Sequence, residues 1–237
     1  MNKQSNTYTI IYIIVMVVVV GAALAFTSIS LKDRQQANAD ADKMRQILAS
    51  VNVEVSQDEI TDEYNRLITN TFVVDSEGNR VADAPDAFSI NVALQSKEAT
   101  DKRLLPVYEC TLSDGSVKYI LSMYGAGLWG PIWGYAAVDS DGSTVYGAYF
   151  AHQGETPGLG AEIEKPAFSD QFQGKHLLFD GNFRPIEVIK SGMPAPENAD
   201  YVDAISGGTI TSKGVASMID NCLAPYGAFL SKLANNN

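Results

Sequence analysis

The chain has 237 residues, enough for one good-sized domain with a substantial core and an appendage. Its 17 basic and 28 acidic residues give a net charge of −11. No cluster of Lys and Arg is available to neutralise phosphates, so a nucleic acid is excluded from the expected partners. Cys110, Cys222, His152 and His176 lack the spacings of a zinc or iron–sulfur site. We expect the two cysteines to be buried free thiols.

The N-terminal segment is apolar over a length that suits a membrane. No charged residue occurs from Gln4 to Leu31, and residues 10–26 form an unbroken apolar run. A helix needs about 20 apolar residues to cross a bilayer. We therefore predict a transmembrane helix over residues 8–29, preceded by a cytoplasmic N-terminus of residues 1–7.

A cleaved signal peptide is the alternative to this anchor, because Ala23-Leu24-Ala25 resembles a cleavage site. Against it, the apolar run exceeds the roughly 7–15 residues usual in a signal peptide, and only one basic residue, Lys3, precedes the run. Charge alone leaves the orientation open, because Lys3 on one side is balanced by Lys32 and Arg34 on the other.

Residues 30–100 predict a membrane-proximal region of helices and strands. Residues 33–51 carry an apolar stripe and predict a helix that continues or restarts beyond the membrane. Ser56 and Glu59 have the spacing of a capping box and predict the start of a second helix. Ser76–Asn79 lies between two apolar segments and predicts a hairpin turn.

Residues 101–237 predict a strand-rich domain that ends in a helix. Turn sequences at Ser113–Ser116 and Asp139–Ser143 each separate two apolar segments and indicate hairpins. The predicted strands cover residues 105–112, 117–124, 132–138, 144–151 and 183–189, and the predicted helices cover 166–175 and 212–233. The fold class is α+β: a single N-terminal transmembrane helix plus a mostly antiparallel sheet with flanking helices.

Two glycine-rich segments invite comparison with nucleotide-binding loops. Gly125–Gly130 matches G-x-G-x-x-G, but a strand is predicted after it instead of a helix, which excludes a dinucleotide-binding loop. Residues 206–214 (SGGTITSKG) are not a Walker A loop, because Ser212 stands where glycine is required. They can still face a phosphate, since Thr211 or Ser212 can cap the following helix and Lys213 adds positive charge. An ordinary glycine-rich turn is the alternative.

Asp203–Thr209 (DAISGGT) resembles the flavinylation motif of the FMN-bind family, D-x-x-(S/T)-G-A-T. In that family a flavin transferase uses FAD to place FMN on the last Thr of the motif through a phosphoester. The resemblance therefore implies that Thr209 is the acceptor. Gly208 stands where alanine is usual, and we expect slightly looser recognition from the missing methyl group.

The resemblance extends to Gly127–Tyr135 (GLWGPIWGY) and Glu155–Ala161 (ETPGLGA), which stand in the same order as signature segments of the family. With the anchor and the chain length, they are similar to the membrane-anchored, FMN-carrying C-subunits of the sodium-translocating NADH:quinone oxidoreductases. The resemblance implies an electron carrier with covalent FMN and no complete active site of its own. Its partners would be the five other subunits of a membrane complex that oxidises NADH, reduces ubiquinone or menaquinone and exports sodium ions.

Two alternatives stay open beside this interpretation. The flavin-carrying G-subunit of the Rnf-type ferredoxin:NAD oxidoreductases shares the flavinylation motif and the anchor. A flavin-free, membrane-tethered binding module is the alternative of another class. A covalent bond suits a domain outside the cytoplasm, where no dependable FMN pool refills an emptied site. We therefore expect the anchor in the bacterial inner membrane and the soluble domain on the periplasmic side.

An isoalloxazine ring needs an apolar wall and a few polar contacts. Leu128 and Trp129 are expected to form one wall, Leu159 the opposing face, and the Glu155-Thr156 turn the polar contacts. A solvated loop charge is the alternative for Glu155.

Neither Trp133 nor His152 is assigned to the cofactor. Trp133 lies in a predicted strand and is expected in the core, and His152 is expected to be a loop or hydrogen-bonding residue and not a ligand. No catalytic or metal-ligating residue is expected. The expected cofactor-binding residues are Thr209 (the covalent site), Ser206, Gly207, Gly208, Thr211, Lys213, Leu128, Trp129, Glu155, Thr156, Gly158 and Leu159.

Overall fold

A computed structural model of the protein describes residues 6–235. The chain divides after Lys43 into two units. The long helix α1 (Asn6–Ala49) makes up the described part of the first unit and supplies the first residues of the second. Because α1 runs without a break, the helix predicted over residues 33–51 continues from the apolar segment and does not restart.

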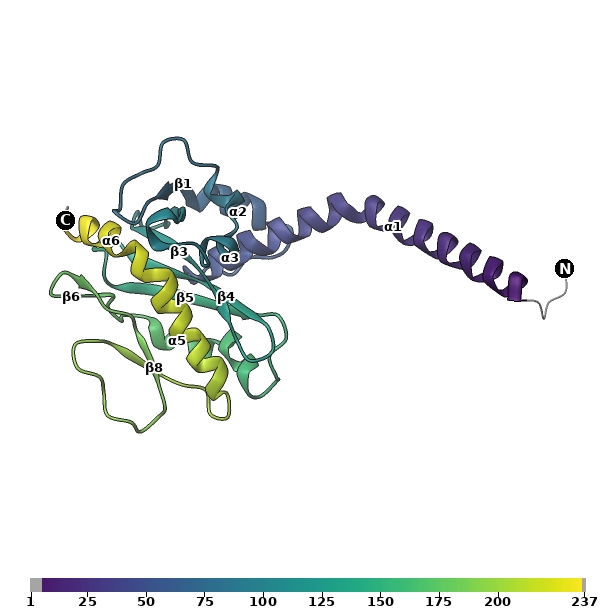
Figure 1. The fold of residues 1–237 in the computed structure, drawn as a ribbon. Helices are drawn as coiled ribbons and strands as arrows, with labels where there is room; N and C mark the ends of the chain where they lie inside the picture. Colours follow the sequence, from purple (N-terminus) through teal and green to yellow (C-terminus); the bar gives the residue numbers. More distant parts are fainter. Residues whose placement is uncertain (1–5, 236–237) are drawn as a thin grey trace. The chain divides into compact units, whose positions relative to one another are not determined.

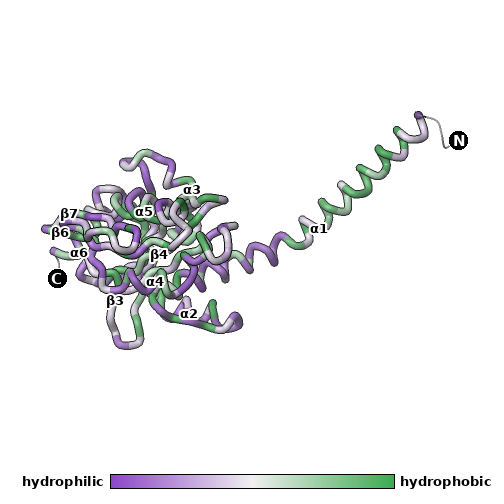
Figure 2. Tube along the Cα trace, turned by 90° about the horizontal axis from the view of Figure 1, so that it is seen from below, coloured by the Kyte–Doolittle hydropathy of each residue, from purple (hydrophilic) through white to green (hydrophobic). Residues whose placement is uncertain are grey.

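The N-terminal part of α1 carries the apolar run. Among the described residues, α1 is the one helix long and apolar enough to span a membrane, with a mean hydropathy of 2.8 in its most apolar stretch. Figure 2 shows these apolar residues along the part of the helix nearest the N-terminus. The predicted span of residues 8–29 lies within α1. Of the predicted cytoplasmic N-terminus, residues 1–5 lie outside the described residues.

Five antiparallel strands form the central sheet of the second unit, in the order β1-β2-β3-β4-β5. The strands are β1 (Ile68–Val74), β2 (Leu105–Thr111), β3 (Val117–Ala126), β4 (Pro131–Asp139) and β5 (Val145–His152). Neighbours in this sheet are also neighbours in the chain. The hairpins predicted around Ser113–Ser116 and Asp139–Ser143 are confirmed, as is the turn at Ser76–Asn79, where Val74 pairs with Arg80.

Two C-terminal helices cover one face of the sheet (Figure 1). They are α5 (Thr209–Leu223) and α6 (Gly227–Asn235), joined by the 3-10 turn η5 (Ala224–Tyr226). The paired residues Val107 and Leu121 pack on this face, whereas their neighbours Tyr108 and Ile120 pack on the opposite one, as the period of two along a strand requires. The apolar stripe predicted for the C-terminal helix is confirmed: its buried members are Val215, Met218, Ile219, Cys222 and Leu223.

The other face of the sheet is covered by the last turns of α1 and by α2 (Ile60–Leu67). Ile47 and Leu48 of α1 are completely buried there. The indole N–H of Trp133 on β4 donates to Gln46 Oε1 at 2.9 Å. Both predicted thiols, Cys110 and Cys222, are free and buried, one on each face.

The remaining elements are short. They are η1 (Ala87–Ser89), α3 (Val92–Gln95), η2 (Thr100–Lys102), η3 (Gly160–Glu164), α4 (Pro166–Ser169), η4 (Asp170–Phe172), the antiparallel pair β6 (Leu178–Phe179) and β7 (Asn182–Phe183), and the parallel pair β8 (Glu187–Ile189) and β9 (Tyr201–Asp203). The helix predicted over residues 166–175 is thus shorter and ends in a 3-10 turn. The strand predicted over 183–189 is split, and Pro185, which cannot donate a ladder hydrogen bond, lies in the break.

Two predicted helix starts are wrong. Ser56 Oγ donates to the Glu59 carboxylate at 2.8 Å, so neither side chain caps α2, which begins at Ile60. The C-terminal helix begins at Thr209, three residues before its predicted start at Ser212. Thr211 and Ser212 therefore lie inside the first turn, where their buried hydroxyl groups bond to other parts of the chain instead of capping the helix.

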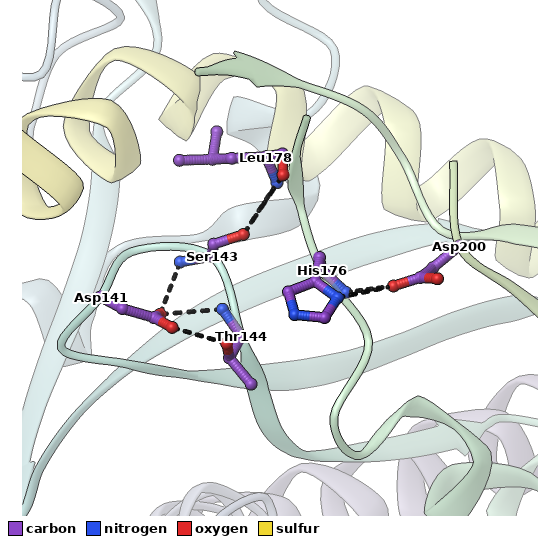
Figure 3. A network of polar contacts seen from close by, with 6 residues as sticks. All are labelled: Asp141, Ser143, Thr144, His176, Leu178 and Asp200. Atoms are coloured by element: carbon purple, nitrogen blue, oxygen red, sulfur yellow. Dashed lines mark hydrogen bonds and ion pairs between the residues drawn. The ribbon is translucent and has the colours of Figure 1, made fainter. Parts of the chain in front are cut away.

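A network of polar contacts fixes the chain just before β9 (Figure 3). The Asp200 carboxylate accepts from the backbone N–H of His176 at 2.7 Å and lies 3.0 Å from its ring Nδ1. Ser143 Oγ accepts from the backbone N–H of Leu178 at 3.2 Å, and Asp141 accepts from the backbone N–H groups of Ser143 and Thr144 at 2.8 Å. The β4–β5 turn and Asp200 thus both hydrogen-bond to residues 176–178. These bonds hold Asp200, the residue directly before β9, in place at the start of the segment that leads to residues 203–209.

Candidate functional site

Thr209 is exposed at the first position of α5. The preceding Gly207 has a φ of +77°, a left-handed backbone conformation that favours glycine. The helix then starts at once, with the backbone N–H of Ser212 donating to Gly208 O at 2.9 Å. Thr209 lines two pockets.

The first pocket, called here the apolar pocket, has a volume of about 210 Å³. It is lined by Leu128, Glu155, Thr156, Leu159, Gly160, Gly207, Gly208, Thr209, Ile210 and Thr211. Leu128, Leu159 and Ile210 are 47%, 41% and 55% exposed. Large apolar side chains left exposed together around a concave surface are typical of a binding site.

Trp129 lies beside the apolar pocket and is not part of its lining. Its side chain is 69% exposed, so it is not a core residue. Ile210 is a lining residue that the sequence interpretation missed. The signal was present: Ile210 follows the motif threonine and falls outside the buried stripe of α5, so an exposed apolar side chain was to be expected beside Thr209.

Glu155 joins the turn between β3 and β4 to α5. Its carboxylate accepts from the backbone N–H of Trp129 at 2.8 Å and from Thr211 Oγ1 at 2.5 Å. The side chain is only 4% exposed, which excludes the solvated loop charge considered above. Two glycines make room for it: a Cβ on Gly127 would lie 2.5 Å from Glu155 Oε1, and one on Gly160 would lie 2.5 Å from Oε2.

These contacts set the charge state of Glu155. Burial raises the pKa of its carboxyl group, but the hydrogen bonds from Thr211 and from the backbone of Trp129 and Leu128, with a contribution from His152, outweigh burial. The net pKa lies below its ordinary value, so Glu155 is ionised at neutral pH and serves as a double acceptor. Its oxygens are occupied by the protein itself, which makes it a support for the pocket wall.

The loop from Thr156 to Leu159 completes this wall. Thr156 O accepts from the backbone N–H of Leu159 at 3.1 Å, and Gly158, with a φ of +74°, donates from its N–H to Glu162 Oε1 at 3.1 Å. His152 accepts the backbone N–H of Glu155 on its Nδ1 at 3.1 Å, which confirms the expected hydrogen-bonding role.

The wall also packs against the motif glycines. A Cβ on Gly207 would lie 2.6 Å from Leu159 Cδ2. At Gly208, where the family usually has alanine, a Cβ would lie 3.0 Å from Ile205 Cγ2 and 3.3 Å from Gly160 N. An alanine would therefore require Ile205 and Gly160 to shift by a few tenths of an ångström.

The second pocket, called here the lysine pocket, has a volume of about 370 Å³. It is lined by Val188, Lys190, Ser191, Ala204, Ile205, Ser206, Gly207, Thr209, Ser212 and Lys213. Ser206 and Lys213 were predicted as site residues. Lys190 and Ser191 were missed, because they come from the residues after β8 and reach the site only through the pairing of β8 with β9.

The segment Gly125–Gly130 forms the end of the β3–β4 hairpin, where the backbone N–H of Gly127 donates to Gly130 O at 2.8 Å. The strand β4 follows directly. This confirms that the segment is a hairpin turn and not the start of a dinucleotide-binding helix.

Residues 127–224 match the FMN-binding domain family. The match includes the turn that carries Leu128, the loop that carries Glu155 and the whole of α5, and thus all three segments around Thr209. The fold and the site define an FMN-binding domain.

The chain is also similar to named proteins. It is 33% identical over 214 residues to the C-subunit of the Na(+)-translocating NADH-quinone reductase of Vibrio parahaemolyticus, with 81% of each chain covered. It is 44% identical over 131 residues to the C-subunit of the same reductase from Vibrio vulnificus, where the alignment covers 54% of this chain and 50% of that protein. In that alignment the chain spans about half of the relative's length.

A solved structure has the same fold. The crystal structure of the C-subunit of the Na(+)-translocating NADH-quinone reductase from Parabacteroides distasonis matches with a TM-score of 0.79 and 49% sequence identity, covering 84% of this chain and 96% of that one. The chain belongs to the family of C-subunits of the Na(+)-translocating NADH-quinone reductases.

Proposed function

We propose that this chain is the flavin-carrying subunit of a sodium-translocating NADH:quinone oxidoreductase, with FMN bound covalently to Thr209. The observation that carries the proposal is the convergence of three segments, residues 127–130, 155–161 and 203–213, around the exposed Thr209. Each of these segments belongs to the FMN-binding domain match.

The residues around Thr209 fit such a group. The start of α5 offers backbone N–H groups and the positive end of a helix dipole, both of which favour a phosphate. Leu128, Leu159 and Ile210 offer exposed apolar surface to a flat aromatic ring. FMN supplies the capacity to accept and release electrons, and the protein binds and orients it.

Attachment requires a flavin transferase. A bond forms between the Thr209 hydroxyl oxygen and the FMN phosphorus of FAD, the bond between the two phosphates of FAD breaks, AMP leaves, and the hydroxyl proton is released. An exposed threonine at the tip of a helix is accessible to such an enzyme, and one hydroxyl suffices because the transferase supplies the activation.

In this role the chain relays electrons between fixed partners. The partners are the five other subunits of an inner-membrane complex that oxidises NADH, reduces ubiquinone or menaquinone and exports sodium ions. The apolar part of α1 anchors the protein, and the domain after it faces the periplasm. The names of the relatives weigh against the Rnf-type alternative, and the FMN-binding domain match weighs against a flavin-free module.

The test is the intact mass of three variants expressed with a flavin transferase. Thr209→Val keeps the side-chain shape and removes the hydroxyl, so this protein should fold, insert in the membrane and lack the FMN mass. Thr209→Ser keeps a hydroxyl and should retain part of the modification. Thr211→Val is the control: it loses the hydrogen bond to Glu155, at a cost of about 1–3 kcal/mol, but should still carry FMN.

Two results would contradict the proposal. If Thr209→Val carried the FMN mass and Thr211→Val lacked it, the acceptor would be Thr211 and not Thr209. If the unmutated protein never gained the mass, the covalent flavoprotein interpretation would be wrong.

A further inference from the structure

The lysine pocket and the apolar pocket share only Gly207 and Thr209 among their lining residues. Its volume of about 370 Å³ falls in the range of roughly 300–1,000 Å³ typical of ligand sites. The walls combine the hydroxyl groups of Ser191 and Ser206 with two lysines, Lys190 and Lys213. This composition suits a small anion with several oxygen atoms.

The register of two strands brings Lys190 to the motif. β8 and β9 are parallel, with Ile189 opposite Asp203, and the backbone N–H of Ala204 donates to Ile189 O at 2.7 Å. Lys190, the next residue after β8, is therefore held beside the start of the DAISGGT segment. Lys213 reaches the same pocket from the first turns of α5.

Both lysines are exposed, and within residues 6–235 neither forms an ion pair. In a chain with a net charge of −11, two exposed lysines that line one pocket give it a local positive charge. The first N–H groups of α5 have no helical acceptors and add to the positive potential.

We propose that the lysine pocket is an anion subsite that seats the phosphodiester on Thr209, with Lys190 and Lys213 as positioning residues. The inference rests on the proposed function and adds Lys190, which lies outside the family motif, to the site. The pocket has more room than one phosphodiester needs, and its hydroxyl groups suit the polyol chain that follows the phosphate. The ring is then directed toward the apolar pocket.

The first experiment uses the full chain in a phosphate-free detergent, made without a flavin transferase and titrated with inorganic phosphate by NMR. We expect shifts at Ser191, Ser206 and Lys213, and a loss of affinity of roughly 10-fold in Lys190→Gln. Lys97→Gln, which removes an exposed lysine that does not line the pocket, should bind phosphate like the unmutated chain.

The second experiment distinguishes the tethered phosphodiester from free phosphate. After flavinylation, verified by intact mass, the chain should no longer bind inorganic phosphate in the pocket, and its ³¹P signal should move in Lys190→Gln but not in Lys97→Gln. Phosphate binding that survives flavinylation, or a ³¹P signal that Lys190→Gln leaves in place, overturns the subsite. Failure to gain the FMN mass contradicts the proposed function instead, and the titration of the unmodified chain still reports on the pocket.

Discussion

At the scale of single residues, the charged carboxylate of Glu155 accepts hydrogen bonds from two different segments. An ionised carboxylate has acceptors on both oxygens, and here one oxygen takes the backbone N–H of Trp129 and the other takes the hydroxyl of Thr211. A glutamine amide offers an oxygen to only one of the two donors. The wall that carries Leu128 is thereby joined to the helix that carries Thr209.

Glu155→Gln should therefore destabilise the protein in a pH-dependent way. At pH 7 we expect the free energy of unfolding to fall by about 2 kcal/mol, since hydrogen bonds to a charged group are lost. The folded-state pKa of Glu155 is lowered, so its contribution is present above the unfolded-state pKa of about 4.3 and is lost as the pH falls through the folded-state value.

Urea unfolding of the wild type and the variant between pH 7 and pH 3 measures this difference. The difference in the free energy of unfolding between the wild type and Glu155→Gln should stay constant down to about pH 4.3 and become smaller below it. Glu197→Gln, at an exposed loop position, should differ from the wild type by less than about 0.5 kcal/mol. A gap that persists unchanged to pH 3 would contradict the assignment.

Trp129 offers a second test at the residue scale. Its exposed indole lies beside the apolar pocket, and we propose that it packs on the flavin ring. Trp129→Ala should change the absorption and fluorescence of the bound flavin and slow electron relay, with the FMN mass retained. Because the side chain is 69% exposed, stability should change by less than about 0.5 kcal/mol. An unchanged spectrum and rate would show that Trp129 has no contact with the flavin.

At the scale of elements, the site depends on how closely three segments approach the start of α5. Gly160 at the start of η3 is one of the tightest points: a Cβ there would overlap Thr211 Oγ1 and would lie 2.5 Å from Glu155 Oε2. The contact between η3 and the first turn of α5 therefore requires a residue without a side chain.

Gly160→Ala should separate these elements. Because the clash involves atoms that already hydrogen-bond to each other, we expect a loss of about 1–3 kcal/mol in stability and less complete flavin attachment. Gly154→Ala is the matched control, because nothing lies within 4 Å of its added Cβ. The control should be neutral or stabilised by up to about 1 kcal/mol. Intact mass and urea unfolding measure both effects, and equal behaviour of the two variants would count against the tight contact.

At the scale of the whole molecule, α1 contains an apolar segment long enough to span a membrane, and we propose that it anchors the domain there. Its flanking charges do not decide the orientation, so the periplasmic assignment rests on the covalent flavin. A reporter fused after Asp33 should be active only when it is of the periplasmic type. The mature protein should keep its first residues. Activity of a cytoplasmic reporter at this position would reverse the orientation, and a mature chain that starts near Phe26 would replace the anchor with a signal peptide.

Local sequence was sufficient for several structures that depend on residues that are neighbours in the chain. The apolar run of residues 10–26, the turn sequences at 113–116 and 139–143, and the stripe from Val215 to Leu223 each predict their element correctly, because periodicity and turn chemistry act over a few residues. The DAISGGT segment could likewise indicate the family, because the motif consists of consecutive residues.

Only the tertiary structure decided how the site is assembled. The sequence left Glu155 open between a polar contact to the ring and a solvated loop charge, and its burial depends on donors supplied by Trp129 and Thr211. Lys190 enters the site through the pairing of β8 with β9. Thr211 lies inside the first turn of α5 and does not cap it, and its hydroxyl donates to Glu155, which is 56 residues away in the chain. Each of these outcomes depends on contacts between residues far apart in the chain, and no local pattern specifies them.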